Sequence, residues 1–292
     1  MIASINSDSV ELYNIETKEI KRIIGTECRD FIFNNDNTQI SMLCRDGIYI
    51  TNIETNKRIL EIYQEDEKIV SQQYSHDSRY LAILFNGGNK QCNYLRIIEI
   101  STGVCVNTVF LTTTSFTFVA GTNCICTSTC YKIHFNDFIT CEIIKEIEIR
   151  GVLTKICSNS DGSILCGVLN DSSRVVFFNF ETVLYIKDFT NRVVNLEFKN
   201  NILLVETEPD DLFETEYKIY LFDVISQTQV YTLIFDQNIF PISLSTNADF
   251  LVYESDGYIC LKNIYTSVEE KLFECKDNIS AKYIQFGSEI YI

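Results

Sequence analysis

The chain has 292 residues, of which 46% are apolar and 22% are charged, a composition typical of a folded globular protein rather than a disordered one. It holds 24 Lys and Arg against 40 Asp and Glu, which gives a formal net charge of −16. This acid excess argues against a protein whose main role is to grip nucleic-acid phosphates or anionic lipid, because both would be repelled.

The twelve cysteines lie mainly inside apolar runs, as Cys44, Cys166 and Cys260 do. No run approaches the roughly 18 apolar residues of a membrane span, and residues 1–6 lack the basic start of a secretory signal. We therefore expect reduced core thiols and a location in the cytoplasm or nucleus. A metal site is the alternative for one group of residues, but its spacing lacks the paired C-x-x-C of common zinc sites: Cys124, Cys126, Cys130 and His134.

A short phrase recurs along the whole chain. An apolar strand ends in Asn, Asp or Glu, an apolar residue follows, and Thr or Ser usually stands two positions later. The phrase occurs seven times, at Asn14, Asn52, Glu99, Asp137, Asn179, Asp223 and Asn263. The mean spacing of roughly 41 residues is typical of four-stranded propeller blades.

A second marker runs out of phase with the first. A strand is followed by a turn rich in Asn, Asp, Ser or Gly, residues that supply hairpin-turn geometries. These turns lie at 33–37, 74–78, 119–123, 158–162, 198–201, 245–249 and 286–288. After each of the first six turns come an apolar strand and then a second turn, so each unit reads as four strands.

These markers predict an all-β fold, a single seven-bladed β-propeller over residues 1–292. A lone four-stranded sheet cannot cover both its faces, so the sheets must pack on one another. Six blades are predicted at 29–62, 69–110, 114–149, 152–189, 193–235 and 240–274. The chain starts in a second strand, so the last blade should combine 1–24 with 280–292 and close the ring. Residues 289–292 then form a surplus that this scheme does not explain.

The layout resembles the WD-repeat (WD40-like) propellers. Residues 74–82, Tyr-Ser-His-Asp-Ser-Arg-Tyr-Leu-Ala, look like that family's Phe-Ser-Pro-Asp-Gly-Arg-Tyr-Leu-Ala, and 221–224, Leu-Phe-Asp-Val, look like its Leu-Trp-Asp-Val. The pattern extends over essentially the whole chain, which nevertheless has no Trp and no Gly-His before a first strand. The resemblance implies a rigid, non-enzymatic scaffold for protein–protein contacts, a subunit of a multiprotein complex.

No catalytic pattern stands out. Only two histidines occur, and we expect His76 to be a turn residue and His134 a structural strand residue. Phosphate-binding, nucleophile-elbow and zinc-protease motifs are absent. We therefore name no catalytic, cofactor-binding or metal-binding residue, and we expect protein partners rather than a small-molecule substrate or nucleic acid.

Acidic residues concentrate in two connections that should open on the same rim. One joins a second to a third strand and the other joins a fourth to a first strand. We predict an acidic docking rim for a basic partner, with two apolar anchors in the longer loop. The residues are Glu206, Glu208, Asp210, Asp211, Leu212, Phe213, Glu214, Glu216, Glu65, Asp66 and Glu67. The plain alternative is a charge run that serves solubility.

Two further functions remain as alternatives. A phosphoinositide-binding propeller would need paired arginines on a rim, whereas the chain has only Lys21-Arg22 and Lys57-Arg58. A propeller hydrolase or lyase would be favoured by a polar cluster or a bound ion at the central channel, which one sequence cannot reveal.

Overall fold

The computed structural model describes residues 2–6, 9–15, 17–24, 27–63, 68–87, 93–111, 115–170, 173–209, 216–235, 242–245, 248–274 and 284–286. Within these ranges every regular element is a β-strand. The described part of the chain accordingly contains no apolar helix that could cross a membrane.

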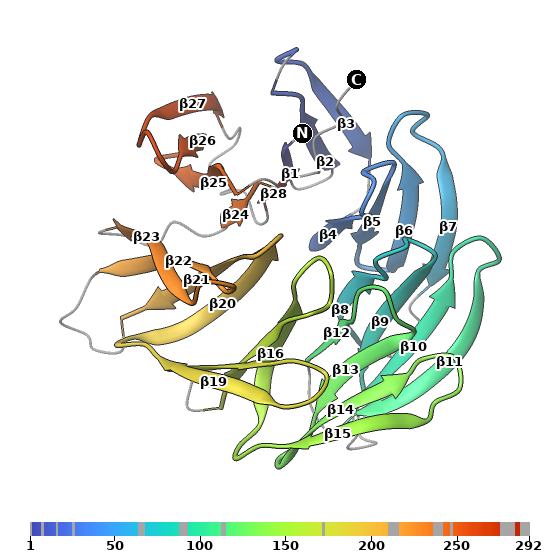
Figure 1. The fold of residues 1–292 in the computed structure, drawn as a ribbon. Helices are drawn as coiled ribbons and strands as arrows, with labels where there is room; N and C mark the ends of the chain where they lie inside the picture. The colour runs from blue at the N-terminus through green and yellow to red at the C-terminus, as the bar shows by residue number, and fades with distance from the viewer. Residues whose placement is uncertain are drawn as a thin grey trace. The chain divides into compact units, whose positions relative to one another are not determined.

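Seven sheets of four antiparallel strands make up the described structure (Figure 1). Blade 1 consists of β28 (Ile284–Phe286), β1 (Ile2–Asn6), β2 (Ser9–Tyr13) and β3 (Ile20–Ile24). Blade 2 consists of β4 (Asp30–Phe33), β5 (Gln39–Leu43), β6 (Gly47–Asn52) and β7 (Arg58–Tyr63). Blade 3 consists of β8 (Lys68–Tyr74), β9 (Tyr80–Asn86), β10 (Asn93–Glu99) and β11 (Val104–Leu111).

The remaining blades repeat this order. Blade 4 consists of β12 (Phe116–Phe118), β13 (Cys124–Ser128), β14 (Lys132–Asp137) and β15 (Ile143–Glu148). Blade 5 consists of β16 (Leu153–Ser158), β17 (Leu165–Leu169), β18 (Arg174–Phe178) and β19 (Val183–Asp188). Blade 6 consists of β20 (Arg192–Lys199), β21 (Ile202–Glu208), β22 (Tyr217–Asp223) and β23 (Thr228–Phe235). Blade 7 consists of β24 (Ile242–Leu244), β25 (Phe250–Ser255), β26 (Tyr258–Asn263) and β27 (Glu269–Glu274).

The predicted fold class, an all-β seven-bladed β-propeller, is confirmed by these sheets. The prediction that a C-terminal strand completes the N-terminal blade is confirmed as well, because β28 pairs with β1, with Ile2 opposite Phe286 and Ser4 opposite Ile284. The surplus residues 289–292 lie outside the described residues.

The chain divides into two compact units. Unit 1 comprises residues 1–66 and 238–292 and contains blades 1, 2 and 7. Unit 2 comprises residues 67–237 and contains blades 3 to 6. The single domain over residues 1–292 stays a prediction, and the pairing of β28 with β1 lies within unit 1.

The first repeat marker is a side-chain cap on the turn between the third and fourth strands. In blade 6, Asp223 Oδ1 accepts hydrogen bonds from the backbone N–H groups of Ile225 and Ser226, at 2.9 and 3.1 Å. Asn or Asp caps the same turn in five other blades, at Asn14, Asn52, Asp137, Asn179 and Asn263. An Asx side chain that satisfies the turn's own donors explains why this residue type recurs at this position.

The second marker caps the turn between the first and second strands. Asn34, Ser75, Asn159 and Ser245 each accept a hydrogen bond from the backbone N–H five residues later. Three residues after each of them the backbone has a positive φ, at Asn37, Ser78, Gly162 and Ala248. The marker's Asn, Ser and Gly content therefore follows from one turn geometry that is used repeatedly.

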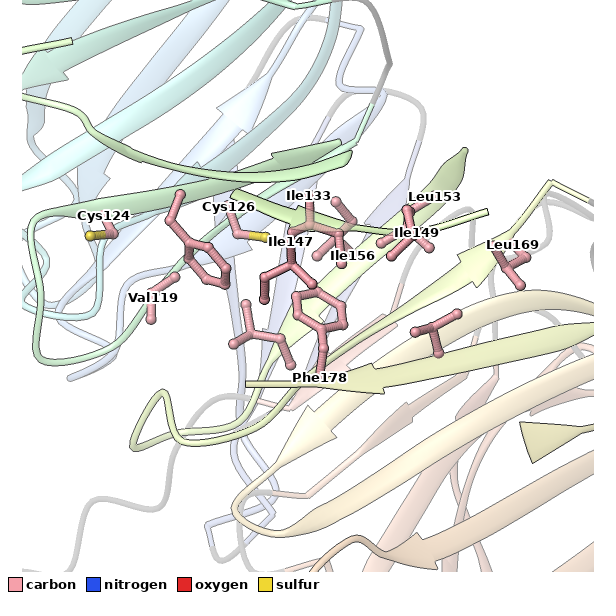
Figure 2. Packing of buried hydrophobic residues seen from close by; sticks show 13 residues of the cluster. Val119, Cys124, Cys126, Ile133, Ile147, Ile149, Leu153, Ile156, Leu169 and Phe178 are labelled. Atoms are coloured by element: carbon pink, nitrogen blue, oxygen red, sulfur yellow. The ribbon is translucent and has the colours of Figure 1, made fainter. Parts of the chain in front are cut away.

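Burial changes across each blade in a regular way. In blade 5 the second strand, β17, is buried at all positions, whereas the fourth strand, β19, is mostly exposed. The middle strands are buried because side chains from neighbouring sheets cover both their faces. Figure 2 shows Ile133 and Ile147 of blade 4 lying against Ile156 and Phe178 of blade 5 in one hydrophobic cluster.

Deleting residues 284–292 should lower the free energy of unfolding on the order of 2 kcal/mol, because β1 loses one of its two ladder partners. Deleting only residues 287–292 keeps β28 and serves as the control. Urea unfolding followed by circular dichroism measures both. Equal unfolding midpoints for the two deletions would contradict a structural role for β28.

Candidate functional site

The described part of the predicted acidic rim includes three carboxylates, Glu206, Glu208 and Glu216. The other predicted residues lie outside the described residues: Asp210, Asp211, Leu212, Phe213, Glu214, Glu65, Asp66 and Glu67. The three described carboxylates differ sharply in exposure and contacts.

Glu206 is buried inside blade 6 and cannot present its carboxylate to a docking partner. It lies in β21 directly opposite Asn195 of β20, and its exposed fraction is 2%. Asn195 Nδ2 donates a hydrogen bond to Glu206 Oε1 at 2.9 Å. Burial raises the pKa of Glu206 to about 8, with a further increase from Glu197. This corrects the prediction for Glu206: strand β21 continues to Glu208, so the residue belongs to the sheet and not to the loop.

The two other described carboxylates are partly neutralised by basic neighbours. Arg192 Nη1 lies 2.8 Å from Glu208 Oε1, and Lys218 Nζ lies 3.3 Å from Glu216 Oε2. Both pairs retain exposed side-chain surface, so solvent weakens the attraction within each pair. Any net negative charge of this connection must therefore come mainly from the acidic residues between positions 209 and 216.

A polar cluster joins the first strands of blades 5 and 6. Lys155 Nζ of β16 donates a hydrogen bond to Asn195 Oδ1 at 3.1 Å, and Asn195 in turn bonds Glu206. Lys155 retains exposed surface, yet desolvation lowers the pKa of its ammonium group, against the opposing effects of Glu206 and Cys157. The shifts of Lys155 and Glu206 both favour the neutral form. We call Lys155, Asn195 and Glu206 the inter-blade cluster.

The sequence analysis missed the inter-blade cluster. A signal was present, since Lys155 and Asn195 each interrupt an apolar first strand, in Leu153–Ile156 and Val193–Leu196. Lys155 is exposed and Asn195 is half-buried, and polar side chains at such positions need hydrogen-bond partners on a neighbouring strand or sheet. Only the register of β20 with β21 identifies Glu206 as the partner of Asn195.

A shallow pocket of about 490 Å³ opens where blade 4 connects to blade 5. It is lined by Tyr131, Lys132, Glu148, Ile149 and Arg150. The turn after β13 and the connection after β15 form it, which are the same two kinds of connection that carry the predicted acidic residues. We call it the rim pocket. Its tyrosine is 74% exposed.

Three of the four basic residues considered for phosphoinositide binding have side-chain partners within the protein. Lys21 Nζ donates hydrogen bonds to two backbone carbonyls of the turn after β6. Arg22 pairs with the carboxylate of Glu11 at 2.7 Å, and Arg58 pairs with that of Glu61 at 2.9 Å. No specific observation in the described residues favours this alternative.

The four residues considered as metal ligands do not form a metal site in the described structure: Cys124, Cys126, Cys130 and His134. Among the described residues no three His, Cys, Asp or Glu side chains are placed to hold a metal ion. Cys126 is fully buried, and burial raises the pKa of its thiol. His134 Nε2 lies 3.3 Å from Thr129 Oγ1, while its Nδ1 lies 3.2 Å from Glu146 Oε1 without hydrogen-bond alignment.

These histidine contacts lack the aligned base–carboxylate hydrogen bond of a catalytic triad. Thr129 Oγ1 also lies 3.3 Å from the carbonyl oxygen of Lys132. The contacts therefore fasten the turn after β13. His76, the second histidine, is half-buried in its turn, and burial lowers its pKa.

Comparison with known proteins identifies the fold. No family model matches the chain, and no curated protein matches it. By contrast, 1276 chains of solved structures do. One of them, from the crystal structure of a mitotic checkpoint complex, matches with a TM-score of 0.65 at 14% identity, covering 89% of this chain and 81% of that one. Because the fold is shared so widely, it does not by itself indicate a function.

Replacing Glu206 by Gln should have a pH-dependent effect on the free energy of unfolding. The change on substitution should be more stabilising at pH 8 than at pH 5.5 by about 2 to 3 kcal/mol. The folded state retains the Glu206 proton up to a pKa of about 8, whereas an unfolded chain loses it near its ordinary value. The wild type therefore loses stability as pH rises between these two values, and the variant does not.

Urea unfolding at both pH values measures this difference. Glu208→Gln, which removes a half-buried carboxylate paired with Arg192 on the same strand, is the matched control and should show no comparable pH dependence. Identical pH profiles for the wild type and Glu206→Gln would contradict a protonated buried Glu206.

Proposed function

We propose that the chain is a non-enzymatic interaction scaffold, a WD-repeat-like subunit of a multiprotein complex in the cytoplasm or nucleus. Seven rigid blades that present connecting loops at their edges support this role, because such loops vary without disturbing the sheets. The similar chain from a mitotic checkpoint complex belongs to an assembly of this kind. The proposed partners are other proteins rather than nucleic acid or a small-molecule substrate.

The observation that carries the proposal is the rim pocket. Tyrosine and arginine are enriched among the residues that dominate binding energy in protein interfaces. Here Tyr131 and Arg150 border one depression whose base includes the buried side chain of Ile149. A partner side chain seated there would bury apolar surface and meet polar groups at its edge.

The partner proposed for this surface is basic. The net charge of −16 attracts a cationic protein at long range and raises its association rate. Its lysines and arginines would then pair with the acidic residues of the connection after β21, because Lys132 and Arg150 outnumber Glu148 at the rim pocket. The exposed ring of Tyr131 can also accept a cation over its face.

The double variant Tyr131→Ala, Arg150→Ala should lose most co-purifying protein in affinity purification from the native source. Truncating two anchors of this kind costs about 2 kcal/mol or more of binding free energy, roughly a thirtyfold loss in affinity. The matched control is the double variant Tyr265→Ala, Arg79→Ala. It removes the same residue types from turns that join a third to a fourth strand and a first to a second strand. Equal recovery with both double variants would refute docking at the rim pocket.

Charge reversal tests the acidic connection separately. Glu208, Asp210 and Asp211 changed together to Lys should weaken capture of the same protein and reduce its sensitivity to salt. The control reverses Glu54, Glu142 and Glu181, three exposed carboxylates of turns between third and fourth strands. Unchanged capture with the first triple variant, measured at low salt, would restrict docking to the rim pocket.

A further inference from the structure

Two cysteine pairs bring their sulfur atoms into direct contact. Cys157 of β16 and Cys166 of β17 are opposite one another in the strand register, and their Sγ atoms are 3.2 Å apart. Cys28 and Cys44, at the β4–β5 hairpin, have their Sγ atoms 3.0 Å apart. Opposite residues of an antiparallel pair have Cα separations within the range that a disulfide spans.

The pair in blade 5 differs from the pair in blade 2 in its access to solvent. Cys157 is half-buried, so a small reagent can reach its sulfur, while Cys166 is fully buried behind it. Cys28 and Cys44 are both buried. Thiol–disulfide exchange needs an accessible attacking sulfur, so the two pairs should react differently.

A lysine shares a strand face with the accessible sulfur. Lys155 is two residues before Cys157 on β16, where alternate residues share a face, and an ionised Cys157 raises the pKa of Lys155. A thiolate is the nucleophilic form of cysteine. The neighbouring Cys166 thiol, whose pKa burial raises, is the less reactive member of the pair.

We propose that Cys157 and Cys166 form a reversible modification site, a dithiol that a low-molecular-weight disulfide oxidises to an intramolecular disulfide. The Cys157 thiolate attacks one sulfur of the small disulfide, forms a mixed disulfide and releases one small thiolate. Cys166 gives up its proton and attacks the Cys157 sulfur, which closes the intramolecular bond and releases the second small thiol. Two protein thiols are oxidised and one small disulfide is reduced to two thiols.

The site requires no new backbone arrangement, because the two sulfurs are already in contact across paired strands. It is also independent of the proposed scaffold function, since its chemistry involves neither the rim pocket nor a protein partner. Oxidation would replace the ionisable sulfur beside Lys155 by a neutral one.

The test treats the folded full-length chain with oxidised glutathione, traps free thiols by alkylation, and maps the products by peptide mass spectrometry. We expect a disulfide that links Cys157 to Cys166 and reverts on adding reduced glutathione. The exposed Cys105, Cys130 and Cys141 report that the reagent is active. The buried Cys28 and Cys44 should remain alkylatable only after unfolding.

Two variants separate the steps. Cys166→Ser should accumulate the mixed disulfide of glutathione at Cys157, and Cys157→Ser should leave Cys166 unoxidised. The control variant Cys130→Ser should form the Cys157–Cys166 disulfide as the wild type does. The wild type alone decides the proposal if a variant fails to fold. A persistent mixed disulfide at Cys157, a bond from Cys157 to another cysteine, or free Cys157 after Cys105 has reacted would each overturn it.

Discussion

Burial of both faces of a four-stranded sheet is the constraint on which the rest of this structure depends. A single blade has apolar side chains on both sides of its middle strands, and a sheet alone in water would leave them exposed. Blades 4 and 5 solve this by sharing one cluster, in which Ile147 and Phe178 are almost fully buried. Blades 5 and 6 share another, which includes Cys166, Phe177 and Leu203. The outer strands of a blade are largely exposed to solvent, and they carry its polar side chains.

The fold could be predicted from the sequence because its periodic features arise from local chemistry. A residue such as Asp223 caps its own turn, so the requirement for Asn or Asp appears at the same place in successive blades whatever the neighbouring sheets contain. The same holds for Ser75, which bonds the first residue of the next strand. Closure through β28 could also be inferred, since a blade without a first strand at one terminus needs it from the other. The division into two compact units could not be, because the repeat continues across both boundaries between the units.

The candidate site was harder to predict because it depends on register and on contacts between blades. Glu206 and Glu208 look like the start of an acidic loop in the sequence, yet the ladder of β21 includes both. The two side chains share one face of β21, and the register places Glu206 against Asn195 inside the blade, while Glu208 meets Arg192 near the end of the strand. Hydropathy patterns report which residues are polar, but they do not report which polar residue of a neighbouring strand lies opposite. The rim pocket escapes sequence analysis for the same reason: its residues come from two separate connections.

Lys155 links two pieces of chemistry that the sequence shows as unrelated. On one side, its ammonium group bonds Asn195, which holds Glu206; on the other, it interacts with the sulfur of Cys157. Each anion near Lys155 favours its charged form, and desolvation opposes it. Lys155 therefore connects the dithiol of blade 5 to the buried carboxyl group of blade 6 through a single side chain.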